Sequence, residues 1–321
     1  MTVRVAPEAG LFLGVDGGGT KTHFICIDNR GTVVAEAEAG TSYHLQAGLD
    51  GAVHVLRVGV AAICAALAIA PSSFAHAFFG LPAYGEDSRI DPRLHAACGE
   101  ILGHGRYRCG NDMVCGWAGS FGCEDGINLV AGTGSIGYGE RRGRAARIGG
   151  WGEVFSDEGS AYWIAVQGLN AFTRMSDGRL PRSELYGRLK EALRLAEDMD
   201  VCARIMGETG MVRGDIAALS RVVSQAARDG DAVAASILEQ AASALAEMAI
   251  ALRSRLGFET GEDARLSWSG GVLTGGAGVL PLLRARIDAV GGFCLVEPRY
   301  APGYGAALYA RYVHAGEQRS G

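Results

Sequence analysis

Glycine is concentrated in five short bursts between apolar runs, and this feature constrains the fold more than any other. The chain has 321 residues, of which 49 are glycine. The bursts fall at 14–19, 132–139, 149–152, 270–278 and 303–305. Glycine between apolar segments marks tight turns, or loops in which the backbone closely approaches another group. The pattern therefore predicts an α/β chain whose glycine loops converge on one ligand.

Apolar and polar residues alternate around turn formers in two separate parts of the chain, and each part predicts a β-meander. The strands are expected at 11–15, 22–27 and 32–37, and again at 127–131, 136–140 and 144–148. Helices are expected at 50–68, 92–102, from about 113, and at 159–174, 182–194, 215–228, 232–256, 279–289 and 305–314, with further strands at 74–79, 106–109, 266–268 and 293–296. The organisation repeats although the sequence does not.

Composition excludes several classes of partner. The net charge is −5 and the basic residues are scattered, so we expect no nucleic-acid partner. The longest apolar stretch, 58–70, is shorter than the roughly 20 residues that a bilayer span needs, and it predicts a buried helix in a protein without a membrane partner. Residues 1–10 lack the features of a signal peptide and are expected to form a loose tail. The eight cysteines form no CxxC pair, which is typical of reduced thiols in the cytoplasm.

The first glycine loop, Asp16-Gly17-Gly18-Gly19-Thr20-Lys21-Thr22, stands between two predicted strands. Its glycines allow a hairpin to present backbone N–H groups to phosphate oxygens, and Asp16 at the strand end can bind Mg²⁺ through water. It is not a Walker A loop, because Thr20 occupies the lysine position and a strand follows where a helix is required. The alternative is a glycine-rich hairpin that binds nothing.

The second and third loops also follow strands. Gly132, Gly134 and Gly137 match GxGxxG, but a turn-rich hairpin follows in place of a helix, which disfavours a dinucleotide site. The run Ser269-Gly270-Gly271-Val272-Leu273 lies between a strand and a helix, where a backbone can pack against a nucleoside. A plain strand-to-helix turn explains this third run equally well.

These loops, with Asp112 and the run Gly149-Gly150-Trp151-Gly152-Glu153-Val154-Phe155-Ser156-Asp157-Glu158-Gly159-Ser160-Ala161-Tyr162-Trp163, resemble the N-acetylglucosamine kinases. Those belong to the BadF/BadG/BcrA/BcrD ATPase family in the actin/hsp70/hexokinase superfamily. The resemblance runs from Leu11 to about Leu308. It implies two ribonuclease-H-like lobes with an ATP and sugar cleft between them. The lobes are expected at 1–118, with 305–321 packing back on it, and at 119–304, which carries helical insertions.

The resemblance also implies a set of site residues, with ATP and Mg²⁺ as cofactors. Asp112 matches the catalytic base, and Asp16 is the expected metal ligand. The expected ATP-binding residues are Asp16, Gly17, Gly18, Gly19, Thr20, Lys21, Gly132, Thr133, Gly134, Ser135, Gly270 and Gly271. The expected sugar contacts are His44, Asp112, Gly150, Asp157 and Ala161. His44 stands where the family carries an asparagine. Alternatively, Asp112 and Asp157 cap the helices that follow them.

The resulting hypothesis is a cytoplasmic, homodimeric, ATP-dependent kinase that converts N-acetylglucosamine to its 6-phosphate. Changed residues in the sugar half of the site keep glucosamine and N-acetylmuramate open as substrates. An ATPase activator of an acyl-CoA dehydratase or reductase is the alternative from another class. Its only support is the local group Cys109, Cys115 and Cys123, which does not form a cluster-binding run.

Overall fold

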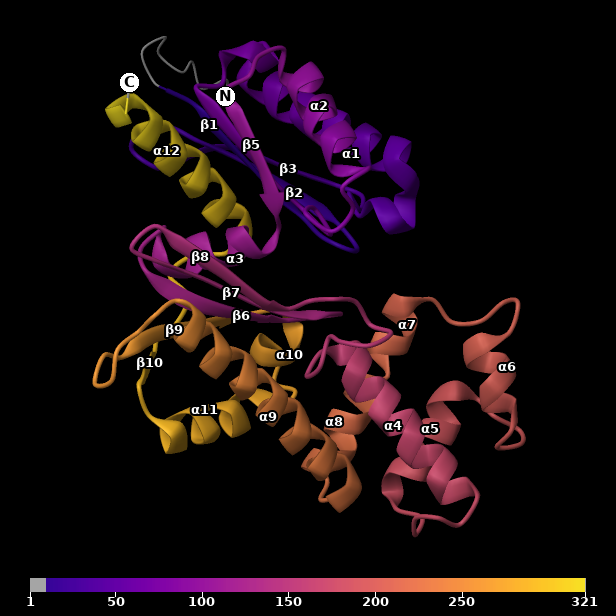
Figure 1. Ribbon diagram of the computed structural model, residues 1–321. Coiled ribbons are helices and arrows are strands. Elements are labelled where there is room, and N and C mark those ends of the chain that lie inside the picture. The colour runs from indigo at the N-terminus through magenta and orange to yellow at the C-terminus, as the bar shows by residue number, and fades with distance from the viewer. Residues whose placement is uncertain (1–9, 321) are drawn as a thin grey trace. The chain divides into compact units, whose positions relative to one another are not determined.

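The structure is a computed structural model that describes residues 10–320 (Figure 1). The predicted N-terminal tail lies, except for its last residue, outside the described residues. The chain forms two compact units: the part up to Asp125 together with the segment from Glu297 onward, and Gly126–Val296. The expected lobe boundaries, 118/119 and 304/305, fall inside helices α3 (Met113–Phe121) and α12 (Pro302–Ser320). These two helices pack on each other, so both belong to the first unit.

The first unit contains a five-stranded sheet with the order β3-β2-β1-β4-β5. Its strands are β1 (Phe12–Gly17), β2 (Thr22–Ile27), β3 (Val33–Ala39), β4 (His76–Leu81) and β5 (Tyr107–Asn111). β1, β2 and β3 pair antiparallel, as the predicted meander requires, whereas β4 and β5 run parallel to β1.

Helices cover both faces of this sheet (Figure 1). α1 (His44–Leu67) and α2 (Asp91–Leu102) lie on one face, with the short 3-10 helix η1 (Pro71–Ser73) between them in sequence. α12 contacts β1, β2 and β4 on the other face. Gly14 permits this contact, because a Cβ atom there would overlap the backbone nitrogen of Ala307. The glycine burst at 303–305 therefore serves packing: a Cβ on Gly305 would overlap the α3 backbone at Cys115. The prediction that all five bursts converge on one ligand is wrong for this one.

The second unit repeats the topology of the first. Its sheet has the order β10-β9-β6-β7-β8, with antiparallel pairing among the first three strands in sequence and parallel pairing of β6 with β9 and of β9 with β10. The strands are β6 (Gly126–Ala131), β7 (Ser135–Arg141), β8 (Arg144–Gly149), β9 (Ala264–Ser269) and β10 (Phe293–Leu295). The predicted structural repeat is confirmed.

Most of the helices of the second unit lie between β8 and β9 in sequence. They are α4 (Ala161–Ser176), α5 (Glu184–Leu193), α6 (Asp200–Met206), α7 (Arg213–Ala218), α8 (Ser220–Arg228) and α9 (Ala232–Arg255), followed by α10 (Gly271–Thr274) and α11 (Val279–Val290). Asp231 caps α9 by accepting hydrogen bonds from the N–H groups of Val233 and Ala234. The three- and four-residue spacing of apolar residues in the helix expected at 232–256 predicts a stripe that faces the core. Ile237, Ala241, Leu245, Met248 and Leu252 are buried there, and Val233 packs partly buried beside them.

Three helix predictions need correction. The helix expected at 215–228 is two helices, α7 and α8, which meet at Leu219. α6 was not predicted, because Val201 is its only buried residue and it shows no apolar periodicity. The first helix begins at His44, not near residue 50, and Gly48 interrupts it with φ 72° and ψ 165°.

Within residues 10–320, two helices, α1 and α9, are long and apolar enough by length and composition to cross a membrane. Both pack against a sheet of their own unit. Val60 and Ile63 of α1 are buried in the first core, and Leu245 of α9 is buried in the second. One side of each helix thus belongs to the protein core, as expected for the stretch 58–70, while Val58 of α1 and Ile250 of α9 are exposed.

Candidate active site

The carboxyl ends of three parallel strands meet at one edge of the first sheet. Asp16 of β1 pairs in register with Gly80 of β4, which in turn pairs with Gly110 of β5. Asp112 follows β5 directly and precedes the first residue of α3. Ligands of open α/β sheets bind outside the carboxyl ends of their strands. The fold therefore brings the two predicted carboxylates, Asp16 and Asp112, to the edge where such a ligand would lie.

Asp16 and Asp112 are close enough to influence each other electrostatically. Burial, and then the negative charge of Asp112, raise the pKa of Asp16 to about 7, while a hydrogen bond with the Cys115 thiol lowers it. Like charges in a buried setting favour a bound cation or proton between them. Residues 10–320 contain no group of three or more His, Cys, Asp or Glu residues that could hold a metal ion. A site with only one or two carboxylates suits Mg²⁺, because this ion keeps several of its water ligands and also binds the phosphates of the substrate.

Asp112 occupies the N-cap position of α3 without acting as its cap. Its backbone is helical, with φ −61° and ψ −20°, and its side chain accepts no hydrogen bond from the first turn. Asn111 provides that contact, because its Oδ1 accepts a hydrogen bond of 3.1 Å from the N–H of Met113. The capping alternative for Asp112 is therefore not supported, and its catalytic role stays a prediction.

The β1–β2 hairpin requires glycine at its start because of close approach. A Cβ atom on Gly17 would lie 2.5 Å from Ser42 Oγ and 2.8 Å from the carbonyl oxygen of Gly80. The carbonyl of Gly18 accepts a hydrogen bond of 2.8 Å from Thr41 Oγ1. Neither glycine has a φ in the left-handed region. Absence of a side chain, more than special dihedral angles, explains these two positions.

The tip of the same hairpin is exposed. Nothing lies within 4 Å of the position of a Cβ on Gly19, and Thr20 is also exposed. Lys21 forms an ion pair of 2.8 Å with Glu38 on β3. The loop thus leaves Gly19 and Thr20 open to a ligand, whereas the structure directs the Lys21 side chain to the neighbouring strand.

His44 is buried with unmet hydrogen-bonding capacity. Only 7% of the residue is exposed, and neither ring nitrogen has a hydrogen-bond partner. The preceding residues Thr41 and Ser42 contact the hairpin at Gly18 and Gly17, so the chain delivers His44 beside the first loop. A buried polar group without a partner is costly, and its presence in a folded protein needs an explanation. A polar ligand would supply one.

In the second unit, the loop between β6 and β7 is fixed on the start of α4. The N–H of Ala161 donates to the carbonyl of Gly132 at 2.8 Å, and the N–H of Tyr162 donates to that of Thr133 at 3.3 Å. Ser135 Oγ donates to the carbonyl of Glu158 at 2.7 Å. Ala161, a predicted sugar contact, is thereby held against the second predicted phosphate loop.

The third glycine loop meets the second at the carboxyl edge of the second sheet. Gly270 has a φ of 90°, and a Cβ atom on it would lie 2.5 Å from the carbonyl oxygen of Ala131. A residue with a side chain would therefore be both strained and blocked at this position. Gly271, the first residue of α10, is exposed and has open space where a Cβ would stand.

Asp157 lies against the second loop. A Cβ atom on Gly134 would stand 2.6 Å from Asp157 Oδ2, and the carboxylate is buried. The capping alternative for Asp157 is wrong, because Ser160 is the N-cap of α4 and its Oγ accepts a hydrogen bond from the N–H of Trp163. Gly150, with φ 68°, packs on Ile136 at the start of β7. The predicted residues of the second unit are therefore neighbours of one loop.

Arg213 also belongs to this group, although the sequence did not indicate it. Its Nη2 lies 2.8 Å from Asp157 Oδ2. A single arginine in a polar stretch carries no recognisable pattern, so only the fold reveals this contact.

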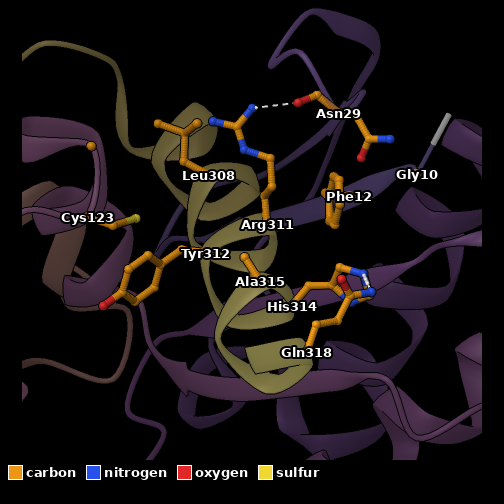
Figure 2. A pocket seen from close by; sticks show the side chains of 11 residues that line it. Gly10, Phe12, Asn29, Cys123, Leu308, Arg311, Tyr312, His314, Ala315 and Gln318 are labelled. Carbon is orange, nitrogen blue, oxygen red and sulfur yellow. Dashed lines mark hydrogen bonds between the residues drawn. The ribbon is translucent and has the colours of Figure 1, made fainter. Parts of the chain in front are cut away.

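A pocket of about 600 Å³ in the first unit lies elsewhere (Figure 2). It runs along α12, where Figure 2 shows a hydrogen bond between Arg311 and Asn29 and another between His314 and Gln318. Phe12, at the opposite end of β1 from Asp16, also lines it. No predicted site residue lines this pocket.

The chain is similar to known proteins over most of its length. Residues 13–310 match the model of the BadF/BadG/BcrA/BcrD ATPase family. The chain belongs to this family. Within it, the chain is 32% identical over 235 residues to the N-acetylmuramic acid/N-acetylglucosamine kinase of Clostridium acetobutylicum, covering 73% of this chain and 76% of that protein. It is 28% identical over 270 residues to the N-acetyl-D-glucosamine kinase of Dictyostelium discoideum, covering 81% and 85%.

A solved structure of similar sequence supports the fold. A proposed N-acetylglucosamine kinase from Chromobacterium violaceum superposes with a TM-score of 0.72 and 26% identity, covering 93% of this chain and 98% of that one. The predicted α/β fold with two ribonuclease-H-like units is confirmed by this likeness and by the two sheets of equal topology.

Proposed function

We propose that this BadF/BadG/BcrA/BcrD family protein is an ATP-dependent kinase that phosphorylates the 6-hydroxyl of N-acetylglucosamine. The observation that carries the proposal is the pair Asp16 and Asp112 at one edge of the first sheet, beside a hairpin with open backbone at Gly19. One carboxylate can bind a metal ion, and the other can accept a proton. The curated relatives described above are both kinases of amino sugars.

Phosphoryl transfer needs in-line alignment, neutralisation of charge and removal of a proton from the attacking hydroxyl. Asp112 accepts the proton of the sugar hydroxyl as the new O–P bond forms and the bond to ADP breaks. Mg²⁺ bound with ATP would lower the charge of the phosphates, and Asp16 is the residue that would hold it, through water. The raised pKa of Asp16 fits a carboxylate that gains a cation in the working enzyme.

The glycine loops hold ATP in this proposal. The loops Gly17–Thr20 in the first unit and Gly132–Ser135 in the second bind the phosphates through backbone N–H groups other than that of Gly132, which donates to the carbonyl of Gly134 at 2.9 Å. Gly270 and Gly271 lie beside the adenosine. The clashes that a side chain would cause at Gly17 and Gly270 support a role for bare backbone at these positions.

The sugar contacts proposed are His44 and Asp112 from the first unit, and Gly150, Asp157 and Ala161 from the second. The proposal for His44 is supported by its two ring nitrogens, which have no hydrogen-bond partner in the protein. The proposal for Asp157 is supported by its buried carboxylate. Discrimination is strong where a missing hydroxyl leaves a buried charge unpaired. N-acetylmuramate remains a second candidate, because a relative with 32% identity is a kinase for both sugars.

An ADP-release assay across N-acetylglucosamine, glucosamine, N-acetylmuramate, N-acetylmannosamine and glucose tests the proposal. We expect the highest kcat/KM with N-acetylglucosamine. Release of ADP that no sugar stimulates would overturn the kinase assignment. We further propose a cytoplasmic homodimer, which light scattering of the purified protein would test.

A further inference from the structure

Arg213, the first residue of α7, pairs with two acidic residues of the loop between β8 and α4. Its Nη2 lies 2.8 Å from Asp157 Oδ2, and its Nε lies 3.2 Å from Glu153 Oε2. The first contact is a hydrogen bond, whereas the Nε–H has no hydrogen-bond partner, so Glu153 is held by charge alone. Asp157 is therefore the principal partner of this guanidinium.

The same guanidinium reaches the second phosphate loop. A Cβ atom on Gly134 would stand 2.8 Å from Arg213 Nη2 and 2.6 Å from Asp157 Oδ2. No side chain thus separates the loop backbone from the ion pair. Three segments that are far apart in sequence meet at this point, and only one of their charged groups, Asp157, has so far been given a role.

Asp157 depends on its surroundings for both its charge and its conformation. Burial raises the pKa of its carboxyl, and the positive charge of Arg213 is the largest influence that lowers it. Its backbone has a φ of 60°, which a residue with a side chain adopts only when the fold imposes it. Without Arg213 the buried carboxylate would take up a proton or turn away.

We propose that Arg213 is the positioning residue for sugar recognition: it keeps Asp157 ionised and fixes the plane of the carboxylate that accepts the sugar hydroxyls. This inference rests on the proposed function. A carboxylate offers about four acceptor positions. Arg213 donates to one oxygen of this carboxylate and leaves acceptor positions for hydroxyl donors.

The test compares Arg213→Gln and Arg213→Lys with the wild-type enzyme in steady-state assays from pH 5 to 9. Arg213→Gln should raise the sugar KM by roughly 10- to 100-fold, the range for losing a hydrogen bond to a charged group. The KM for ATP should stay within about 2-fold, because backbone groups hold the phosphates. Arg213→Lys should recover part of the sugar affinity, since it keeps the charge but not the planar fork.

The pH profile separates positioning from mere structural support. Removing the positive charge raises the pKa of Asp157, so the ionised form exists only at higher pH. On the acid side of the pH profile, kcat/KM for the sugar falls as Asp157 takes up a proton. This acid limb should therefore move to higher pH in Arg213→Gln and return towards the wild-type position in Arg213→Lys. A structural role alone would lower the melting temperature without moving this limb.

Arg141→Gln is the matched control. Arg141 is a buried arginine of the same unit that pairs with Glu262 at 2.6 Å, and no predicted site residue contacts it through this pair. It should lower the melting temperature and leave the sugar KM and the acid limb unchanged. The inference is overturned if both glutamine variants change sugar kinetics alike, or if Arg213→Gln raises only the KM for ATP. A wild-type protein that phosphorylates no sugar would instead overturn the proposed function.

Discussion

His44, a proposed sugar contact, is a buried side chain whose polar groups have no hydrogen-bond partner in the protein. Replacing an unpaired buried polar group by an apolar one of similar size is neutral or stabilising. The unmet hydrogen bonds of His44 therefore cost stability that bound sugar would restore.

Two substitutions of His44 test this at the residue scale. His44→Leu should keep or raise the melting temperature of the ligand-free protein, while the sugar KM rises and the KM for ATP stays nearly unchanged. His44→Ala should also raise the sugar KM, but with a lower melting temperature because it leaves a cavity. Calorimetry and steady-state kinetics provide the measurements. An unchanged sugar KM in both variants would place His44 outside the sugar site.

Asp16 predicts a pH dependence of stability. Its pKa is raised from 3.8 to about 7, so the folded protein holds this proton more tightly than the unfolded chain does. Its contribution to stability is full below about pH 4 and is lost as the pH rises through about 7. Asp16→Asn should therefore stabilise the protein more at pH 8 than at pH 4, as measured by urea unfolding at both values. An equal effect at both pH values would contradict the raised pKa.

The loop between β8 and α4 exposes large apolar residues beside the predicted sugar contacts. Trp151, Val154 and Phe155 are 74%, 86% and 76% exposed, respectively. They lie between Gly150 and Asp157 in sequence. Exposed apolar residues gathered next to a candidate site are typical of a surface that a ligand covers. The loop between β8 and α4 is therefore the part of the second unit whose solvent exposure should change most when a ligand binds.

Tryptophan fluorescence tests this at the scale of the element. Trp117 and Trp268 are buried and Trp163 is half-buried against the core, so the exposed Trp151 should dominate any change in emission on binding. Adding N-acetylglucosamine should shift the emission of the wild-type protein to shorter wavelength as Trp151 leaves water. Trp151→Phe should abolish the shift. If the shift persists in that variant, the loop is not covered by the sugar.

Local patterns predicted the elements that depend on neighbouring residues. Both meanders follow from alternation around turns, and the α9 stripe follows from its three- and four-residue spacing. α6 escaped prediction because it buries almost nothing, and the break in the first helix escaped because a single glycine, Gly48, does not fix its own backbone angles. Weak burial leaves no periodicity in a sequence.

At the scale of the whole molecule, the two sheets of equal order explain why similar glycine hairpins recur in the sequence. The resemblance assigned Asp112 and Asp157 by position, and Asp16 was predicted from its place at the end of a strand. It could not reveal that Arg213 joins Asp157, because only the folded chain brings helix α7 to the second loop. Nor could it show that the side chain of Asn111, and not that of Asp112, accepts a hydrogen bond from the first turn of α3.

The central claim is that Asp112 is the general base of a sugar kinase, and Asp112→Asn tests it most directly. The variant keeps the shape of the side chain and removes the proton acceptor. We expect kcat to fall by roughly 10²- to 10⁴-fold. The Kd for ATP should stay within a few-fold, since the glycine loops are intact. The melting temperature should stay level or rise, because the repulsion between Asp112 and Asp16 is removed.

Asn111→Ala provides the reference for loss of the contact at the start of α3, and its melting temperature should fall. The deciding measurement is kcat of Asp112→Asn with saturating ATP and N-acetylglucosamine. A kcat below about a hundredth of the wild-type value, with ATP affinity and melting temperature retained, is the result expected for a lost base. A kcat above about a tenth of wild type would show that another group takes the proton.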